Sequence, residues 1–199
     1  MTPNFYFLTT KNYPEVASAF APDNTKLSHQ LIPELDEADK LPFELNLVKI
    51  SVGTNGLIKS DLSGLNTIWL DLQPNSLAWY LVSEKLRDLI NRNLKGNEHL
   101  KWISAVINNG TEKRIYYIPR FEKKLDVLDE KRTMYVKGTD HIINPCFSLK
   151  KIRNYAIFHK PDSLDFWRIP SGLYIDKTVK EDILKNKLTG VEFEQVRTA

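Results

Sequence analysis

The sequence predicts an α+β fold with a mixed, largely antiparallel sheet, a few helices and a repeated strand–helix–strand unit. Short segments rich in aromatic and β-branched residues, bounded by turn residues, recur along the 199-residue chain and are typical of strands. Two segments show the three-and-four spacing of apolar residues that indicates an amphipathic helix. Each of these segments follows a strand pattern and precedes a glycine and another strand pattern. The similarity is either an internal repeat of one unit or the convergence of two segments on the same helix-forming pattern.

The first third of the chain has the weakest pattern. Asn4–Leu8 is aromatic and predicts a strand, whereas residues 10–40 are polar and rich in proline. They predict irregular structure with a short helical piece around Glu15–Phe20. Leu41–Val52 alternates apolar and polar residues and predicts a strand that ends at the turn Gly53–Gly56. The expected inward positions of that strand are Leu45, Leu47 and Ile50.

The middle of the chain predicts a strand at Leu65–Leu72 and then the first helix. The Ser83 hydroxyl is the expected helix cap, because it can accept a free backbone N–H of the first turn. Gly96 is expected to end the helix, since glycine adopts the conformation that follows a helical C-terminus at no steric cost. Its apolar face consists of Leu86, Leu89, Ile90 and Leu94.

A hairpin is predicted next, from Leu100–Ile107 through Asn108-Asn109-Gly110 to Arg114–Phe121. Pro119 lacks a main-chain donor, so the return strand is expected to lie at an edge of the sheet or to stop at this residue. Three shorter strands are expected further along the chain, at Thr133–Val136, Tyr155–His159 and Asp165–Ile169.

The C-terminal segment from Gly172 to Val196 has the clearest pattern of all. Leu173–Asp176 predicts a strand whose last residue caps a helix, and Val179 and Ile183 are the expected buried positions of that helix. Gly190 predicts a turn before a final strand at Val191–Val196. This order repeats that of Tyr80–Ile107, where Leu86 and Ile90 lie at the same distances from their cap.

The composition is that of an ordinary globular protein, with 42% hydrophobic and 27% charged residues and a net charge of +3. Acids exceed bases between residues 22 and 50, and bases exceed acids between residues 111 and 160. A single cysteine fits a reducing compartment, and we find no signal peptide and no membrane span, so a soluble cytoplasmic protein is expected. We expect one domain over residues 1–199, with residues 73–76 as the place where a subdivision would fall.

No motif for a metal, a cofactor or covalent catalysis is present in the sequence. The four histidines lack ligand spacing, and no phosphate-binding glycine loop or nucleophile elbow occurs. A nucleophilic pair of Cys146 and His141 would need a spatial approach that the sequence does not encode, and a buried thiol is the simpler interpretation. We therefore expect no metal and no cofactor.

Two segments are candidates for contact with a partner protein. The run from Glu34 to Asp39 is either a solvated surface or a decoy whose carboxylates take the place of phosphate oxygens in a basic groove. The second segment is Phe166-Trp167-Arg168, which has the composition of an interface hot spot and equally that of a core tryptophan with a solvated neighbour. The candidate binding residues are Glu34, Asp36, Glu37, Asp39, Phe166, Trp167 and Arg168.

The stretch Lys113–Lys124 interleaves basic and aromatic residues, which single-stranded nucleic acid binders also do. An edge strand with aromatics inside and bases outside explains the same pattern, and we favour that interpretation.

The segment DFWRIPSGLYIDKTVKEDILKNKLTGVEFEQV resembles the C-terminal signature of bacterial immunity proteins from polymorphic-toxin and contact-dependent competition systems. The pieces that carry the resemblance are Leu173–Asp176, Lys177–Lys185 and Leu188–Phe193. Phe5–Leu8 and the sequence WYLVSEKLRDLI are also similar to the family. Residues 10–40 match nothing recognisable.

The resemblance implies a mixed α+β protein that is not an enzyme and that binds one cognate toxin in the cytoplasm of the producing cell. It supplies no catalytic residues and does not identify the toxin. A nucleic-acid-binding module using residues 113–124 is the alternative function. The expected partner is therefore a toxin domain and not a membrane, with nucleic acid as the partner of the alternative function alone. The sequence leaves the oligomeric state open.

Overall fold

The computed structural model describes residues 4–54, 56–162 and 164–199 of the chain. Its largest sheet has strands in the order β2-β3-β7-β8-β6-β5, and β4 also pairs with β3. The bounds of these strands are β2 (Glu15–Phe20), β3 (Leu45–Gly53), β4 (Gly56–Ser60), β5 (Leu72–Gln73), β6 (Leu81–Val82), β7 (Leu100–Asn108) and β8 (Lys113–Phe121). Apart from the short parallel pairing of β3 with β7, the pairings of this sheet are antiparallel.

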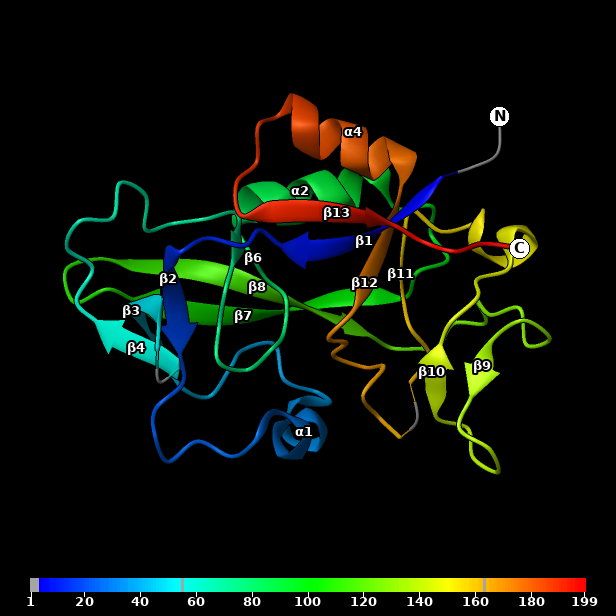
Figure 1. Cartoon of the computed structure of the whole chain (residues 1–199), viewed down its shortest axis with the longest axis horizontal. Helices are drawn as coiled ribbons and strands as arrows, with labels where there is room; N and C mark the ends of the chain where they lie inside the picture. Colours follow the sequence, from blue (N-terminus) through cyan, green and yellow to red (C-terminus); the bar gives the residue numbers. More distant parts are fainter. Residues whose placement is uncertain (1–3, 55, 163) are drawn as a thin grey trace.

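A second sheet of four strands brings the two ends of the chain together. Its order is β11-β12-β1-β13, and each pairing is antiparallel. The strands are β11 (Ile157–His159), β12 (Leu173–Asp176), β1 (Phe5–Thr10) and β13 (Val191–Gln195). A small hairpin of β9 (Met134–Tyr135) and β10 (Ile142–Asn144) lies to one side (Figure 1).

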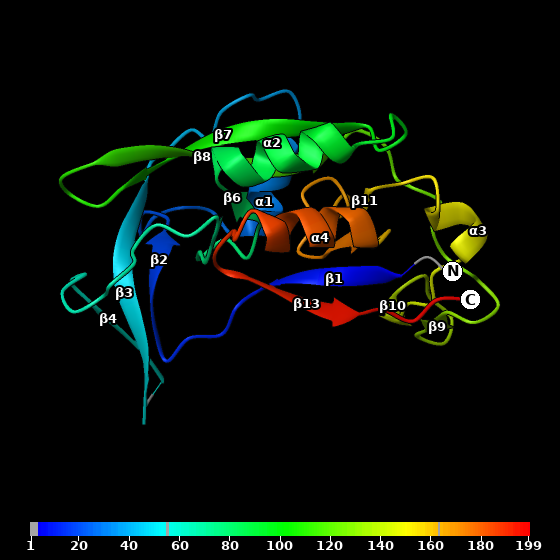
Figure 2. The same ribbon diagram turned by 90° about the horizontal axis from the view of Figure 1, so that it is seen from above.

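Two long helices connect the sheets. The helices α2 (Glu84–Asn93) and α4 (Lys177–Lys185) pack against each other, with α2 on β6 and β8 and α4 on β1 and β12. Figure 2 shows them side by side, α2 along the large sheet and α4 along the small one. The remaining helical turns are short: α1 (Ser28–Leu31), η1 (Ile32–Leu35) and α3 (Leu149–Ile152).

Local sequence accounts for both long helices. The Ser83 hydroxyl accepts the N–H of Leu86 at 3.3 Å, and the Asp176 carboxylate accepts the N–H of Val179 at 3.0 Å, as the sequence predicts. The apolar residues spaced along α2 and α4 are buried. They are Leu86, Leu89 and Ile90 in α2, and Val179 and Ile183 in α4.

The topology supports the repeated unit. In the first unit β6 and β7 both pair antiparallel with β8, which lies between them. In the second, β12 and β13 flank β1 in the same way. Each unit is thus a strand–helix–strand in which a third strand separates the two, the split arrangement known from other α+β folds.

The core has two parts, one on each face of the large sheet. The first contains α2, α4 and the small sheet, and the second packs α1 and η1 against β2, β3, β7 and β8. Tyr80 links the two sheets, since its hydroxyl donates to the carbonyl of Leu8 and accepts the N–H of Leu173. Burial raises the pKa of Tyr80, so this phenol stays protonated and keeps donating.

Several expectations from the sequence were wrong. Residues 15–20 form the strand β2 and not a helix, because alternate alanines face the core and the strand pairs with β3 along its length. Leu65–Leu72 is mostly irregular, with only Leu72 entering β5, and residues 164–168 form a turn instead of a strand. Leu45 and Leu47 are buried, whereas Ile50 lies on the opposite face of β3 and is partly exposed.

The edge position expected for Arg114–Phe121 was right only in part, because β8 lies between β7 and β6 in the sheet. In the described residues, β6 pairs with β8 only at Val82–Tyr117, so β8 has a free edge before this pair, and Pro119 lies beyond it. Within residues 73–76, Gln73 is fully buried, and its side-chain amide donates to the carbonyl of Ala17 at 2.6 Å.

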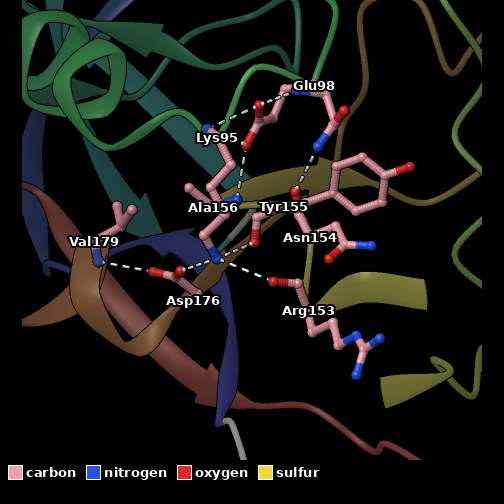
Figure 3. Close-up of polar contacts among 9 residues, drawn as sticks. Lys95, Glu98, Arg153, Asn154, Tyr155, Ala156, Asp176 and Val179 are labelled. Carbon is pink, nitrogen blue, oxygen red and sulfur yellow. Dashed lines mark hydrogen bonds and ion pairs between the residues drawn. The ribbon is translucent and has the colours of Figure 1, made fainter. Parts of the chain in front are cut away.

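A buried carboxylate joins the first unit to the second (Figure 3). Glu98, which is 1% exposed, accepts main-chain N–H groups of Lys95, Asn97 and Ala156 at 2.8–3.1 Å. The Lys95 ammonium in turn donates to the cap residue Asp176 at 2.8 Å. Carboxylate and ammonium together tie the end of α2 to the start of α4.

Replacing Glu98 with glutamine should lower the free energy of unfolding by about 1–3 kcal/mol, because an amide would turn its own donors toward buried N–H groups. Urea denaturation measures the change. Glu181→Gln is the control, since this exposed residue pairs, among the residues that the structure describes, only with Lys177, and its loss should change stability by about 0.5 kcal/mol or less. Equal effects of the two substitutions would contradict the role given to Glu98.

Candidate functional site

The acidic segment, Glu34–Asp39, is held against the second core by its main chain. Leu35 is buried, and the buried guanidinium of Arg120 donates to the carbonyl oxygens of Leu35 at 2.8 Å and Ala38 at 3.2 Å. The N–H of Ser104 donates to the Asp39 carbonyl at 2.8 Å, which attaches the end of the segment to β7. The side chains of the four acids, Glu34, Asp36, Glu37 and Asp39, are exposed. The segment therefore has a fixed backbone and a solvated acidic face.

The aromatic turn, residues 164–168, lies next to the acidic segment. The Arg168 guanidinium forms an ion pair with Asp36 and another with Asp165 at 3.2 Å. The main-chain carbonyl of Arg168 accepts the N–H of Phe121 at 2.7 Å, so the turn is fastened to the end of β8. The Asp36–Arg168 pair spans 132 positions of sequence and joins both candidate segments into one surface.

The three aromatic-turn candidates differ in exposure. Phe166 is 39% exposed, and Arg168 is partly exposed between its two carboxylates. Trp167 is 9% exposed, because its indole packs inward on the imidazole of His159 with ring centroids 5.7 Å apart. Trp167 therefore packs in the interior beneath the surface. Of the three candidates, only Phe166 and Arg168 have side chains that a partner can contact.

His159, beneath this surface, is fully buried between Trp167 and Phe121. Its Nε2 accepts the N–H of Leu125 at 3.3 Å, which leaves Nδ1 to donate to the carbonyl of Lys160 at 2.8 Å. Burial lowers the pKa of His159 below its ordinary value of about 6.5, so the folded protein holds it neutral.

The buried His159 predicts a loss of stability on mild acidification. Below pH 6.5 the unfolded chain binds a proton here that the folded chain does not, so the free energy of unfolding falls by up to about 1.4 kcal/mol per pH unit, until the folded pKa is reached. Urea denaturation at pH 7, 6 and 5 should show a smaller fall for His159→Gln than for the natural protein. Parallel pH profiles would contradict this assignment.

A groove of about 410 Å³ borders the joined surface between α1 and the aromatic turn. Its walls are mostly apolar and include Ile32, Leu77, Trp79, Phe166 and Ile169. Leu27 at one rim and Leu164 in the aromatic turn are 63% and 76% exposed. Large exposed apolar side chains beside a groove are characteristic of protein contact sites.

The acidic side chains differ in their partners within the protein. Glu34 forms an ion pair with Lys26, and Asp36 forms one with Arg168. Over the described residues, Glu37 and Asp39 have no ion pair, so their carboxylates are the ones oriented to attract a basic partner. A decoy role therefore depends on these two more than on the other pair.

The other sequence-predicted residues do not come together as a site. Cys146 is 1% exposed, and its main chain bonds with the Thr133 hydroxyl, while His141 is exposed before β10. In the part of the chain that the structure describes, no group of three or more histidine, cysteine or carboxylate residues could hold a metal ion.

The basic and aromatic residues of Lys113–Lys124 do not form a row along one face. Lys113 pairs with Glu44 at 2.7 Å and Arg114 with Glu112 at 2.7 Å, while Tyr116 and Arg120 are buried. These internal partners compete with phosphate contacts, so the arrangement does not favour the nucleic-acid alternative.

This surface combines exposed acids with an exposed phenylalanine beside a groove, and a buried tryptophan packs behind it. Such an arrangement is typical of a protein–protein contact surface. A family model described as Immunity protein family (Imm11) matches residues 60–198. The chain belongs to this family, and the resemblance to bacterial immunity proteins is thereby confirmed. It has an immunity role against a toxin, and its partner is in general terms a toxin protein.

No curated protein matches the chain. The family match includes the aromatic turn and begins after the acidic segment. Immunity proteins are in general not catalysts. None of the helices in the described residues has the length and apolar character that crossing a bilayer requires.

Sequence reasoning found the acidic and aromatic residues but missed the groove between α1 and the aromatic turn. Leu77 and Trp79 line it from the segment before β6, and Arg120 fixes the acidic backbone from β8. Trp79 precedes a strand pattern in the sequence, which predicts an ordinary core residue. A signal for this arrangement was Arg120 within the apolar second half of β8, since a buried arginine requires acceptors nearby.

Proposed function

We propose that this protein, acting as one domain over residues 1–199, binds a cognate bacterial toxin in the cytoplasm and neutralises it by non-covalent occlusion. The toxin's active site or substrate groove would be covered by the acidic segment, the exposed part of the aromatic turn and the adjoining groove. In this proposal the protein works by binding alone and catalyses no reaction.

The observation that carries the proposal is the ion pair between Asp36 and Arg168, which unites two exposed segments from opposite ends of the chain. Arg120 and Phe121 hold the main chains of the two segments through hydrogen bonds, so little conformational entropy is lost when a partner docks. Phe166 and Leu164 supply apolar anchors, and the carboxylates of Glu37 and Asp39 supply charge at the rim.

The chemistry of the rim indicates which kind of toxin fits. Carboxylate oxygens accept hydrogen bonds from arginine and lysine much as phosphate oxygens do. A toxin whose groove binds a phosphate-containing substrate would present such bases to Glu37 and Asp39. Occupation of that groove would exclude the substrate without any covalent step.

The test uses, as the candidate toxin, the C-terminal domain of the protein that the adjacent upstream gene encodes. The purified proteins should form a stable 1:1 complex, and expression of this chain should restore growth of cells that produce the toxin. A toxin domain from an unrelated system is the control and should show neither effect. Failure of both binding and rescue with the neighbouring toxin would overturn the proposal.

A further inference from the structure

A second cleft lies along the edge of β8, where β6 leaves the sheet. The strand β6 ends after two residues because Ser83 caps α2 and the chain turns into the helix. The last residue pair between β6 and β8 is Val82–Tyr117. On the side away from β7, the described residues provide no paired strand for β8 from Lys113 to Tyr116. This open edge is bordered by a cleft of about 670 Å³.

The hydrogen-bond pattern of the hairpin determines which main-chain groups face the cleft. The N–H of Asn109 donates to the carbonyl of Glu112 at 3.1 Å, and bonded pairs alternate from there along β7 and β8. By this alternation Ile115 directs its N–H and carbonyl away from β7. Phe121, at an equivalent position, donates outward to Arg168. In the described residues, no backbone partner of Ile115 is found on the cleft side.

The walls of the cleft are rigid and aromatic. The guanidinium of Arg114 lies 4.7 Å from the ring centre of Trp69, and Glu112 accepts hydrogen bonds from both side chains. Arg87 covers Tyr117 in the same manner, at 3.9 Å. Stacked arginines and aromatics held in place before binding are typical of contact residues with large binding contributions.

The unpaired charges of the cleft are positive. Among its lining residues, Glu84 pairs with Arg87 at 3.1 Å and Arg114 pairs with Glu112 at 2.7 Å. Lys85 and Lys187 are exposed lining residues, and neither forms an ion pair with any residue that the structure describes. The carboxylate of Asp71 is turned away from a ligand, because it accepts bonds from the Ser83 hydroxyl at 2.7 Å and the Thr189 N–H at 2.8 Å. A partner that complements this cleft is therefore acidic.

We propose that the cleft binds an extended, acidic segment of the toxin, which adds as a strand to the open edge of β8. Its main chain pairs with Ile115, an apolar side chain packs on the 56% exposed Ile115 side chain, and its carboxylates reach Lys85 and Lys187. This inference rests on the proposed function and places a second toxin contact on a face other than the acidic one.

The test compares two charge-reversed variants in binding to the neighbouring toxin domain. The variant Lys85→Glu/Lys187→Glu should bind at least about tenfold more weakly than the natural protein, with a smaller dependence on salt. Lys137→Glu/Lys150→Glu, which reverses two exposed lysines elsewhere, has the same net charge and should bind as the natural protein does. Hydrogen exchange of the Ile115 amide should slow at least about tenfold in the complex.

Each outcome has one meaning. Toxin binding by the natural protein with equal affinities for both variants would overturn this inference and leave the proposed function intact. Weaker binding without protection of the Ile115 amide would overturn strand addition. Absence of binding by the natural protein would overturn the proposed function, and this inference with it.

Discussion

Replacing Gly190 with alanine is expected to lower the free energy of unfolding by roughly 2–5 kcal/mol. Gly190 has a φ of +78°, where a side chain is strained. An added Cβ would lie 2.4 Å from the carbonyl oxygen of Leu72 and 2.9 Å from the Cβ of Leu70. Neither atom is the end of a flexible side chain, so the backbone itself would have to move.

Gly138→Ala is the matched control for this prediction. Gly138 has a φ of +80°, but no atom lies within 4 Å of the position that its Cβ would take. Its substitution should therefore show the conformational strain alone, roughly 1–2 kcal/mol. Urea denaturation of both variants separates strain from collision, and equal losses would mean that the turn moves away from Leu72 without cost.

The position of Gly190 explains why the sequence of the C-terminal unit, Gly172–Val196, has so clear a structural pattern. Its turn connects α4 to β13 and also lies on the large sheet, where the N–H of Leu72 donates to the Thr189 carbonyl at 3.1 Å. The N–H of Lys11 donates to the Gly190 carbonyl at 2.9 Å. One tight turn thus holds both sheets and the N-terminal strand together.

The elements that sequence predicted well are those with strong local chemistry. Ser83 and Asp176 cap their helices as expected, and both helices bury the expected face. The hairpin Leu100–Phe121 was also predicted, because its turn and its alternation agree. In each case the information lies within about ten neighbouring residues.

The elements that were predicted wrongly from the sequence depend on contacts with residues far away in the chain. Glu15–Phe20 has small residues that suit a helix or a strand, and it becomes a strand because β3 provides its hydrogen bonds. The turn at residues 164–168 contains residues common in strands, but the N–H of Arg168 bonds back to the Asp165 carbonyl at 2.9 Å. Tertiary contacts override local preference at such places.

In the candidate surface, too, the sequence indicated the residue types but not the tertiary contacts between them. The residue types of the acidic segment and of the aromatic turn were visible in the sequence, whereas their meeting through Asp36 and Arg168 was not. The direction of Trp167 was equally undetermined, because a tryptophan beside an arginine suits a core or an interface. Only the ring contact with His159 assigns it to the interior.

Reversing the charges of Glu37 and Asp39 to lysine is expected to slow association with the toxin at least about tenfold at low salt. These two acids are exposed and have no ion pair within the described residues, so their reversal changes the surface charge without leaving a buried base unpaired. Reversal of Asp36 would instead place a lysine beside Arg168 and disturb the joined surface itself. Surface plasmon resonance at low and physiological salt measures the association rate.

Glu192→Lys/Glu194→Lys is the control with the same change in net charge. Both residues are exposed on β13, in the small sheet and away from the acidic segment. If long-range attraction to a basic toxin groove guides binding, the Glu37/Asp39 variant should be slower than this control at low salt, and the two should converge as salt screens the charges. Equal association rates at every salt concentration would remove the acidic segment from the contact and leave the apolar groove and Phe166 as its basis.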